Sequence, residues 1–179
     1  RSSSSGNITS SDDEAGGLFG ESYSNFIYES YSSGTVTSDD SFAGGLTGRN
    51  SETTISSSYS TANVNGDDRV GGLVGANGGY IMNSYARGTV TGNSEVGGLA
   101  GRCGREIIDS YSTGEVIGSS DVGGFLGYSD GCDIEDSFWD FETSMQGTSG
   151  GDENGLNTED MKTEATYTIP SEVLDATWD

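Results

Sequence analysis

Acidic residues recur at one place along this sequence, shortly before a repeated Gly-Gly block. They are residues 12–14, Asp39, Asp40, Asp67, Asp68, Glu95 and Asp121. Carboxylates that stack in one column repel each other and favour a hard cation with oxygen ligands, so the two aspartate pairs are candidate Ca²⁺ ligands. The alternative is a solvated acidic edge that prevents aggregation. Because the sequence contains no DxDxDG loop and no GGxGxD nonapeptide, we expect the solvated edge and no cofactor.

The composition excludes several classes of site. The chain has no histidine, which excludes Ser-His triads, Cys-His dyads and the HExxH zinc helix. Its 179 residues carry 29 acidic and 7 basic side chains, a formal net charge of -22, which repels phosphate backbones and anionic lipid. We therefore expect no nucleic-acid partner and no membrane insertion. A carboxylate pair could still act on a glycosidic bond, but nothing distinguishes one pair, and we expect no enzyme.

The two cysteines, Cys103 and Cys132, lie 29 residues apart. This separation is close to one repeat of the pattern described below, so a bridge between neighbouring coils is geometrically reasonable. In a secreted chain such a disulfide contributes roughly 3 to 4 kcal/mol. The alternative is a pair of free thiols in a cytosolic protein.

Aromatic residues also recur at the repeat spacing. They are Tyr31, Tyr59, Tyr85, Tyr111 and Phe138. An exposed file of rings would form a sugar-stacking platform, whereas a buried file would be core or corner packing, which we expect. A second file of Thr and Asn pairs is of the kind that orders water in ice-binding solenoids, but Glu115 and Ile117 interrupt it. We expect those pairs to reflect ordinary strand propensity.

Repeats must position all of these residues. The Gly-Gly block reads AGGLFG at 15–20, AGGLTG at 43–48, VGGLVG at 70–75, VGGLAG at 96–101 and VGGFLG at 122–127, so successive copies begin 28, 27, 26 and 26 residues apart. Each copy is followed by an isoleucine and, three residues later, by Ser-Tyr or Ser-Phe. The opening SGNIT at 5–9 matches SGTVT at 33–37, so the chain starts in mid-repeat and we expect a preceding neighbour.

Each unit contains three short β-prone pieces separated by Gly, Asn, Asp and Ser, and no helical period occurs before about residue 157. This pattern predicts an all-β fold, a β-solenoid (β-helix) of about five coils of 26–28 residues. The repeated apolar positions should point inward and stack one coil apart, at ~4.8 Å. The paired glycines fit a tight corner that has no room for a side chain and where φ turns positive.

The repeat pattern ends near residue 140, which divides the chain into a solenoid over 1–140 and a C-terminal cap over 141–179. Asn157 or Thr158 can cap a helix whose first turn is acidic, so we predict one short α-helix near 157–165. A cap is physically necessary, because an open solenoid end exposes strand edges that recruit other chains. Its apolar face would come from Ile169, Val173, Leu174 and Trp178.

The segment VGGLVGANGGYIMNSYARGTVTG at 70–92 resembles the GLUG repeat, named for its Gly-Leu-apolar-Gly block. The resemblance covers roughly residues 5–140, and SFWDFET at 137–143, GLNTEDMK at 155–162 and ATWD at 176–179 are similar to sequences that end such arrays. GLUG arrays occur in large secreted or surface-anchored prokaryotic proteins, including adhesin-like proteins and the non-catalytic parts of bacterial IgA-cleaving metallopeptidases. The resemblance implies surface display or adhesion and brings no catalytic residues.

We therefore expect a non-catalytic structural or adhesive segment of an extracellular prokaryotic cell-surface protein or surface filament. Its expected partners are cell-surface or extracellular matrix components, through glycans or through self-association at the solenoid ends. The acidic surface stays hydrated at high ionic strength and predicts a halophilic source. The alternative is a carbohydrate-binding or carbohydrate-active β-helix module. A groove with converging carboxylates and exposed aromatics would favour that alternative, and a smooth rod would favour the first hypothesis.

Overall fold

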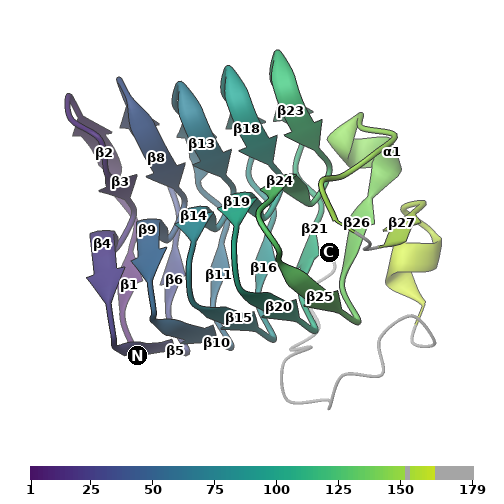
Figure 1. Cartoon of the computed structure of the whole chain (residues 1–179), viewed down its shortest axis with the longest axis horizontal. Helices are drawn as coiled ribbons and strands as arrows, with labels where there is room; N and C mark the ends of the chain where they lie inside the picture. The colour runs from purple at the N-terminus through teal and green to yellow at the C-terminus, as the bar shows by residue number, and fades with distance from the viewer. Residues whose placement is uncertain (152–153, 164–179) are drawn as a thin grey trace.

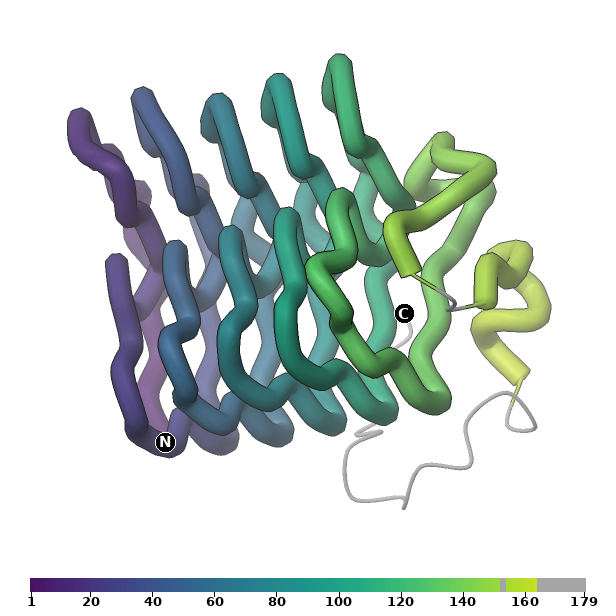
Figure 2. Tube along the Cα trace, viewed as in Figure 1, coloured from purple at the N-terminus to yellow at the C-terminus, as the bar shows by residue number. Residues whose placement is uncertain are grey.

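The computed structural model describes residues 1–151 and 154–163. The chain winds through successive coils that lie side by side along the long axis of the molecule (Figure 1), and the Cα trace in Figure 2 shows the same stack without side chains. Each strand pairs in parallel with the strand one coil away, so that Ile55 lies opposite both Ile27 and Ile81. The β-solenoid of about five coils that the repeat spacing predicts is confirmed.

The coils contribute to five parallel sheets, which we name by their residues. The tyrosine sheet is formed by β1 (Ser3–Ser4), β6 (Tyr31–Ser32), β11 (Tyr59–Ser60), β16 (Tyr85–Ala86), β21 (Tyr111–Ser112), β26 (Phe138–Asp140) and β27 (Asn154–Leu156). The valine sheet is formed by β2 (Asn7–Ser10), β7 (Thr35–Ser38), β12 (Asn63–Asn65), β17 (Val90–Thr91) and β22 (Val116–Ile117). The isoleucine sheet is formed by β5 (Phe26–Tyr28), β10 (Thr54–Ser56), β15 (Tyr80–Met82), β20 (Glu106–Ile108) and β25 (Asp133–Glu135).

Two further sheets meet at the Gly-Gly corner. The entry sheet leads into it and is formed by β3 (Ala15–Gly16), β8 (Ser41–Gly44), β13 (Asp68–Gly71), β18 (Ser94–Gly97) and β23 (Ser120–Gly123). The exit sheet leaves it and is formed by β4 (Phe19–Tyr23), β9 (Thr47–Ser51), β14 (Val74–Asn77), β19 (Ala100–Cys103) and β24 (Leu126–Ser129). A full coil thus has five short strands, whereas the sequence predicts three, because the corner and the bends each interrupt the pairing.

Apolar side chains form ladders inside the coils, as predicted. The leucine and isoleucine ladders share one buried cluster, which contains Leu46, Leu73, Leu99, Phe125, Ile27, Ile55, Ile81 and Ile107, with Leu18 and Ile134 packed against it at the two ends. The valine ladder forms a second cluster with Val36, Val64, Val90 and Val116, and Ile8 packs against it. The narrow core is filled by stacking, so it needs few apolar residues per coil.

The glycines of the corner are required for close approach of the backbone. A Cβ atom on Gly71 would collide with the carbonyl oxygen of Val74 and would lie 2.7 Å from the amide nitrogen of Gly101 in the next coil. The expectation that φ turns positive at these glycines is wrong. The positive φ lies two residues before the glycine pair, at Arg69 with φ 54° and at Glu95 with φ 49°. There the left-handed conformation bends the strand just before the corner.

A ladder of buried serines runs along the tyrosine sheet. Its members are Ser30, Ser58, Ser84, Ser110 and Ser137. The Ser84 Oγ accepts a hydrogen bond from the Ser58 N–H of the preceding coil at 3.2 Å and donates one to the Met82 carbonyl at 2.9 Å. The other members repeat this pair of bonds. The recurring Ser before each aromatic residue therefore accepts a hydrogen bond from a buried backbone N–H that has no partner in the strand pairing.

Removing one serine of this ladder should destabilise the protein clearly. Ser84→Ala leaves the buried N–H of Ser58 without its acceptor, which costs about 1 to 3 kcal/mol. Chemical denaturation of the wild type and the variant measures the difference. The matched control is Ser119→Ala, at an exposed position, which should change stability by less than about 0.5 kcal/mol. Equal small effects at both positions would show that the ladder bonds add nothing.

The last coil is closed by aromatic and helical residues. Trp139 is paired with Ser112 of the preceding coil, and its ring covers Gly124 at the end of the core. The α-helix α1 (Phe141–Ser144) follows directly, with the Asp140 Oδ1 accepting from the N–H groups of Glu142 at 2.9 Å and Thr143 at 3.0 Å. No helix among the described residues has the length and apolar character of a membrane span.

We predicted the short helix near 157–165. In that stretch the described residues form a 3₁₀ turn, η1 (Asp160–Lys162). The Asp160 N–H donates a hydrogen bond to the Asn157 Oδ1 at 2.8 Å. The turn is tied back to the solenoid because the Thr158 Oγ1 donates to Asp140 at 2.7 Å. Residues 164 and 165 of the predicted helix, and Ile169, Val173, Leu174 and Trp178, lie outside the described residues.

Candidate functional site

The acidic residues before the Gly-Gly corner are divided among several files. Asp68 lies opposite Ser41 in one neighbouring coil and Ser94 in the other. One coil after Asp67 the chain places Asn93, whose N–H bonds to the Asp67 carbonyl at 2.8 Å. The prediction of a single carboxylate column is therefore wrong. The copies differ by one or two residues in this loop, and a shift of one residue moves a side chain into another file.

Of the four candidate metal ligands, Asp40 and Asp67 lie opposite each other on neighbouring coils, because the Asp67 N–H donates to the Asp40 carbonyl at 3.2 Å. Asp39, Asp40 and Asp67 are exposed, and Asp68 forms an ion pair with Arg69 at 3.2 Å. Within residues 1–151 and 154–163, no group of three acidic or sulfur-bearing side chains is arranged to hold a metal ion. We therefore propose that these aspartates form a solvated edge, with Ca²⁺ binding as the alternative to be tested.

Ca²⁺ and Mg²⁺ at equal millimolar concentration should raise the melting temperature equally, because both then act by screening alone. Asp40→Asn combined with Asp67→Asn should leave stability within about 0.5 kcal/mol of the wild type. Thermal melts with CaCl₂ and MgCl₂ at matched ionic strength test both points, with Asp133→Asn as a control on another sheet. A Ca²⁺-specific gain of about 2.7 kcal/mol at a hundredfold excess over Kd, abolished by the double variant, would establish the metal ladder instead.

The tyrosine file stacks ring on ring along its sheet. The centroids of Tyr31, Tyr59, Tyr85 and Tyr111 are separated by 5.1, 4.8 and 4.9 Å, with interplanar angles of 6° or less. Neighbouring rings cover the faces of the inner rings, so those faces cannot stack against sugars, although the expected burial is reached only at Tyr111. Exposure falls from 37% at Tyr31 to 7% at Tyr111, which packs with Met161 of the cap. Burial, together with neighbouring Tyr59, raises the pKa of Tyr85.

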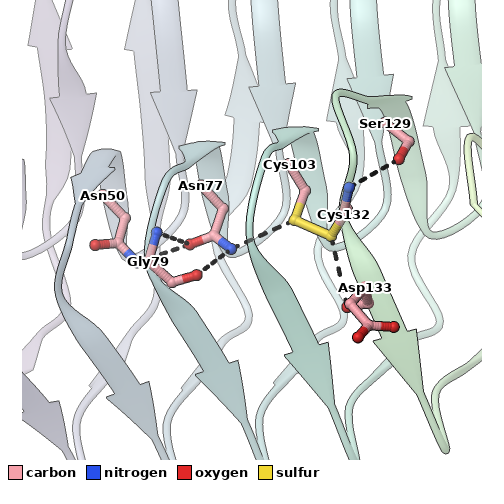
Figure 3. The surroundings of a disulfide bond; sticks show 7 residues. All are labelled: Asn50, Asn77, Gly79, Cys103, Ser129, Cys132 and Asp133. Atoms are coloured by element: carbon pink, nitrogen blue, oxygen red, sulfur yellow. Dashed lines mark hydrogen bonds between the residues drawn. A yellow bond between two sulfur atoms is a disulfide. The ribbon is translucent and has the colours of Figure 1, made fainter.

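The exit sheet contains a buried polar ladder that ends in the disulfide. The Asn50 Nδ2 donates to the Asn77 Oδ1 at 2.7 Å, and the Asn77 Nδ2 donates to the Cys103 Sγ at 3.5 Å (Figure 3). Cys103 and Cys132 are bonded, with their Cα atoms 5.3 Å apart. The register places Cys103 opposite Ser129, and the turn after Ser129 brings Cys132 back beneath it. Of the two alternatives left open by the sequence, the structure has the disulfide.

A groove that the sequence analysis did not predict lies over the corner between the entry and exit sheets. It has a volume of about 400 Å³ and is lined by Phe42, Arg49, Asn50, Ser51, Arg69, Ala76, Asn77, Gly78, Arg102, Gly104 and Asp130. These residues come from four successive coils, so the groove runs across the strands. The signal was present in the sequence, because Arg49, Ala76 and Arg102 each directly follow the last glycine of a Gly-Gly block and Arg69 directly precedes one.

Ion pairs and ring contacts organise the groove. Arg102 donates to Asp130 at 2.8 Å and to Glu95 at 3.2 Å, and the hydrogen bond to Asp130, helped by the charge of Glu95, raises the pKa of Arg102. Glu95 also contacts Arg69 at 3.2 Å. The Arg102 guanidinium lies 5.1 Å from the centre of the Tyr128 ring. These arginine–carboxylate pairs line the groove with donors and acceptors that can contact hydroxyl groups of a ligand.

Comparison with known proteins supports the repeat assignment. The model of the GLUG motif matches residues 66–91. Among solved structures, the chain is similar to a putative immunoglobulin A1 protease from Bacteroides ovatus, with a TM-score of 0.71 and 22% sequence identity over 87% of this chain and 60% of that chain. At that identity the likeness shows the fold alone, and no curated protein matches the chain. Residues 66–91 are thus a GLUG motif, and the chain is a β-solenoid repeat module.

Proposed function

We propose that this chain is a non-catalytic structural and adhesive segment of a prokaryotic cell-surface protein, exposed outside the cell. The uninterrupted stack of parallel coils carries the proposal, because such a stack forms a rod that displays the same positions repeatedly along its side. The bond between Cys103 and Cys132 adds support, since disulfides persist in oxidising compartments. Suitable partners are glycans, other extracellular matrix components and further solenoid ends.

Labelling of intact cells tests the location. An antibody raised against the purified chain should stain intact cells of the source organism, and thiol alkylation of the native protein without a reductant should modify neither Cys103 nor Cys132. An intracellular protein of the same cells, stained only after permeabilisation, is the control. Staining that requires lysis, together with two alkylated cysteines, would contradict the proposal.

The acidic surface supports a halophilic source. Only seven basic residues face 29 acidic ones, so self-repulsion should outweigh attraction at low ionic strength. We expect the melting temperature to rise by roughly 5 °C, about 1 to 2 kcal/mol, between 0.01 and 0.5 M NaCl, where the Debye length falls from 30 Å to below 8 Å. A curve that stays flat over this range and rises only in molar salt would reflect general salting-out and would contradict the halophilic interpretation.

The Arg-lined groove favours a second candidate function, a carbohydrate-binding module. A smooth rod would offer no such recess. We propose binding without hydrolysis, because the acids that contact the arginines of the groove, Glu21, Asp68, Glu95 and Asp130, are all paired with them. They are therefore not a free carboxylate pair of the kind that glycosidases use.

A further inference from the structure

Basic side chains are concentrated in the groove at the Gly-Gly corner. Three of the chain's seven basic residues, Arg49, Arg69 and Arg102, line it together. In a chain of net charge -22, this is a place where three positive charges lie together, each of them in contact with at least one of Glu21, Asp68, Glu95 and Asp130. A partly enclosed recess also screens charge less than open surface does, which strengthens an ionic contact formed within it.

Arg49 and Arg69 present two guanidinium groups over one aromatic ring. Their Cζ atoms lie 5.5 Å and 5.0 Å from the centre of the Phe42 ring. Their acidic neighbours differ: Arg49 contacts Glu21 at 3.9 Å, whereas Arg69 contacts both Asp68 and Glu95 at 3.2 Å. The long contact of Arg49 leaves most of its N–H donors available. Arg49 can therefore pair with a carboxylate of a ligand, and Arg69 adds a second positive charge beside the same ring.

The register of the exit sheet creates a gap beside this arginine pair. Arg49, Ala76 and Arg102 occupy the same position in three successive coils. Arg49 and Arg102 are therefore two strand spacings apart, about 10 Å, with a methyl group between them. Because Ala76 is small, the floor of the groove is open at the place where the neighbouring coils carry long side chains.

We infer that this groove binds an oligosaccharide in which single carboxylate-bearing sugars alternate with neutral sugars. The carboxylate pairs with Arg49 beside Arg69, and the next sugar lies over Ala76 towards Arg102. The inference rests on the adhesive role proposed above and adds the ligand. A linear glycan advances by roughly one strand spacing, ~4.8 Å, per sugar unit, so successive units meet successive coils.

The remaining lining suits the neutral sugars. Asp130 has a side chain that is 59% exposed and can accept from sugar hydroxyls while it is paired with Arg102. Ser51, Gly78 and Gly104 add hydroxyl and backbone groups beside it. Neutral polar groups at this density recognise hydroxyls, which a simple anion site would not require.

Other classes of anionic ligand fit less well. An extended peptide gains affinity by adding a strand to a free sheet edge, but β14 beneath the groove is already paired with β9 and β19. A densely charged polyanion such as a nucleic acid would meet the acidic surface on both sides of the groove. An oligosaccharide with isolated charges avoids both difficulties.

Isothermal titration of the full chain with a hexasaccharide of alternating glucuronate and N-acetylglucosamine tests the inference. We expect binding that is at least about tenfold tighter than to the neutral N-acetylglucosamine hexamer, and a loss of at least about tenfold in Arg49→Gln combined with Arg69→Gln. Ala76→Trp should block the groove and abolish binding while all charges remain. Arg87→Gln, which removes an exposed positive charge outside the groove lining, should bind like the wild type.

Several results would overturn the inference. They are unchanged affinity in both groove variants when circular dichroism shows them folded, equal binding of the neutral hexamer, and equal or tighter binding of a glutamate-rich peptide or of heparin. If no saccharide binds but the chain still adheres to immobilised extracellular matrix, the groove inference fails and the adhesive proposal stands. If the wild-type chain does not adhere to the matrix, the proposed function itself is contradicted.

Discussion

Replacing Cys103 and Cys132 together by serine should lower the free energy of unfolding by about 3 to 4 kcal/mol. The bond closes a loop of 29 residues and ties the last coil to its neighbour. Serine keeps an acceptor near the Asn77 side chain, which donates to Cys103, so the loss reports mainly the covalent link. Urea denaturation of the oxidised wild type and the double variant measures it.

The reduced wild type is the matched control for this experiment. With an excess of a thiol reductant it should unfold at nearly the same urea concentration as the double variant, and the variant itself should not respond to the reductant. If the oxidised and reduced wild-type proteins had the same midpoint, the disulfide would make no contribution and the argument for an oxidising compartment would lose its support.

Gly71→Ala should be strongly destabilising, with a loss of about 3 kcal/mol or more. The added Cβ would meet the carbonyl oxygen of Val74 in its own coil and the amide of Gly101 in the next. Both are backbone atoms in paired strands, so neither can move without breaking the register of neighbouring coils. Denaturation midpoints, or loss of soluble protein on expression, measure the effect.

Gly6→Ala is the control for the glycine substitution. A Cβ at Gly6 meets nothing within 4 Å and the residue is exposed, so the change should be neutral or stabilise by up to about 1 kcal/mol through the unfolded state. Similar effects at Gly6 and Gly71 would show that the corner can relax, and that the repeated glycines reflect something other than close packing.

Much of the fold could be predicted from the sequence because each strand pairs with its own copy one repeat later. The spacing of the Gly-Gly blocks places Ile27, Ile55 and Ile81 in register, and the structure has them so. The same repetition of residue types predicts the buried leucine and valine ladders and a small core. The number of strands per coil was harder to predict, because bends of one or two residues leave no apolar signature.

The candidate site depended on details that repeat periodicity does not carry. Asp40 and Asp67 are aligned as the repeat predicts, but Asn93 follows Asp67 in the next coil, and Asp68 lies between Ser41 and Ser94. A difference of one residue in loop length thus ends the predicted carboxylate column after two coils, although every acidic residue in it was visible in the sequence.

By itself the sequence determined the coil period, the inward ladders, the absence of imidazole chemistry and the acidic surface, since these follow from residue types and from spacings along one chain. Only the tertiary structure decided that Cys103 bonds Cys132 and that Arg49 and Arg69 share the Phe42 ring. Both contacts join residues of different coils or sheets. The turn after Ser129 brings Cys132 to Cys103, and the corner after Phe42 brings Arg49 to the same ring as Arg69. The geometry of these turns depends on backbone contacts, which the side-chain pattern does not encode.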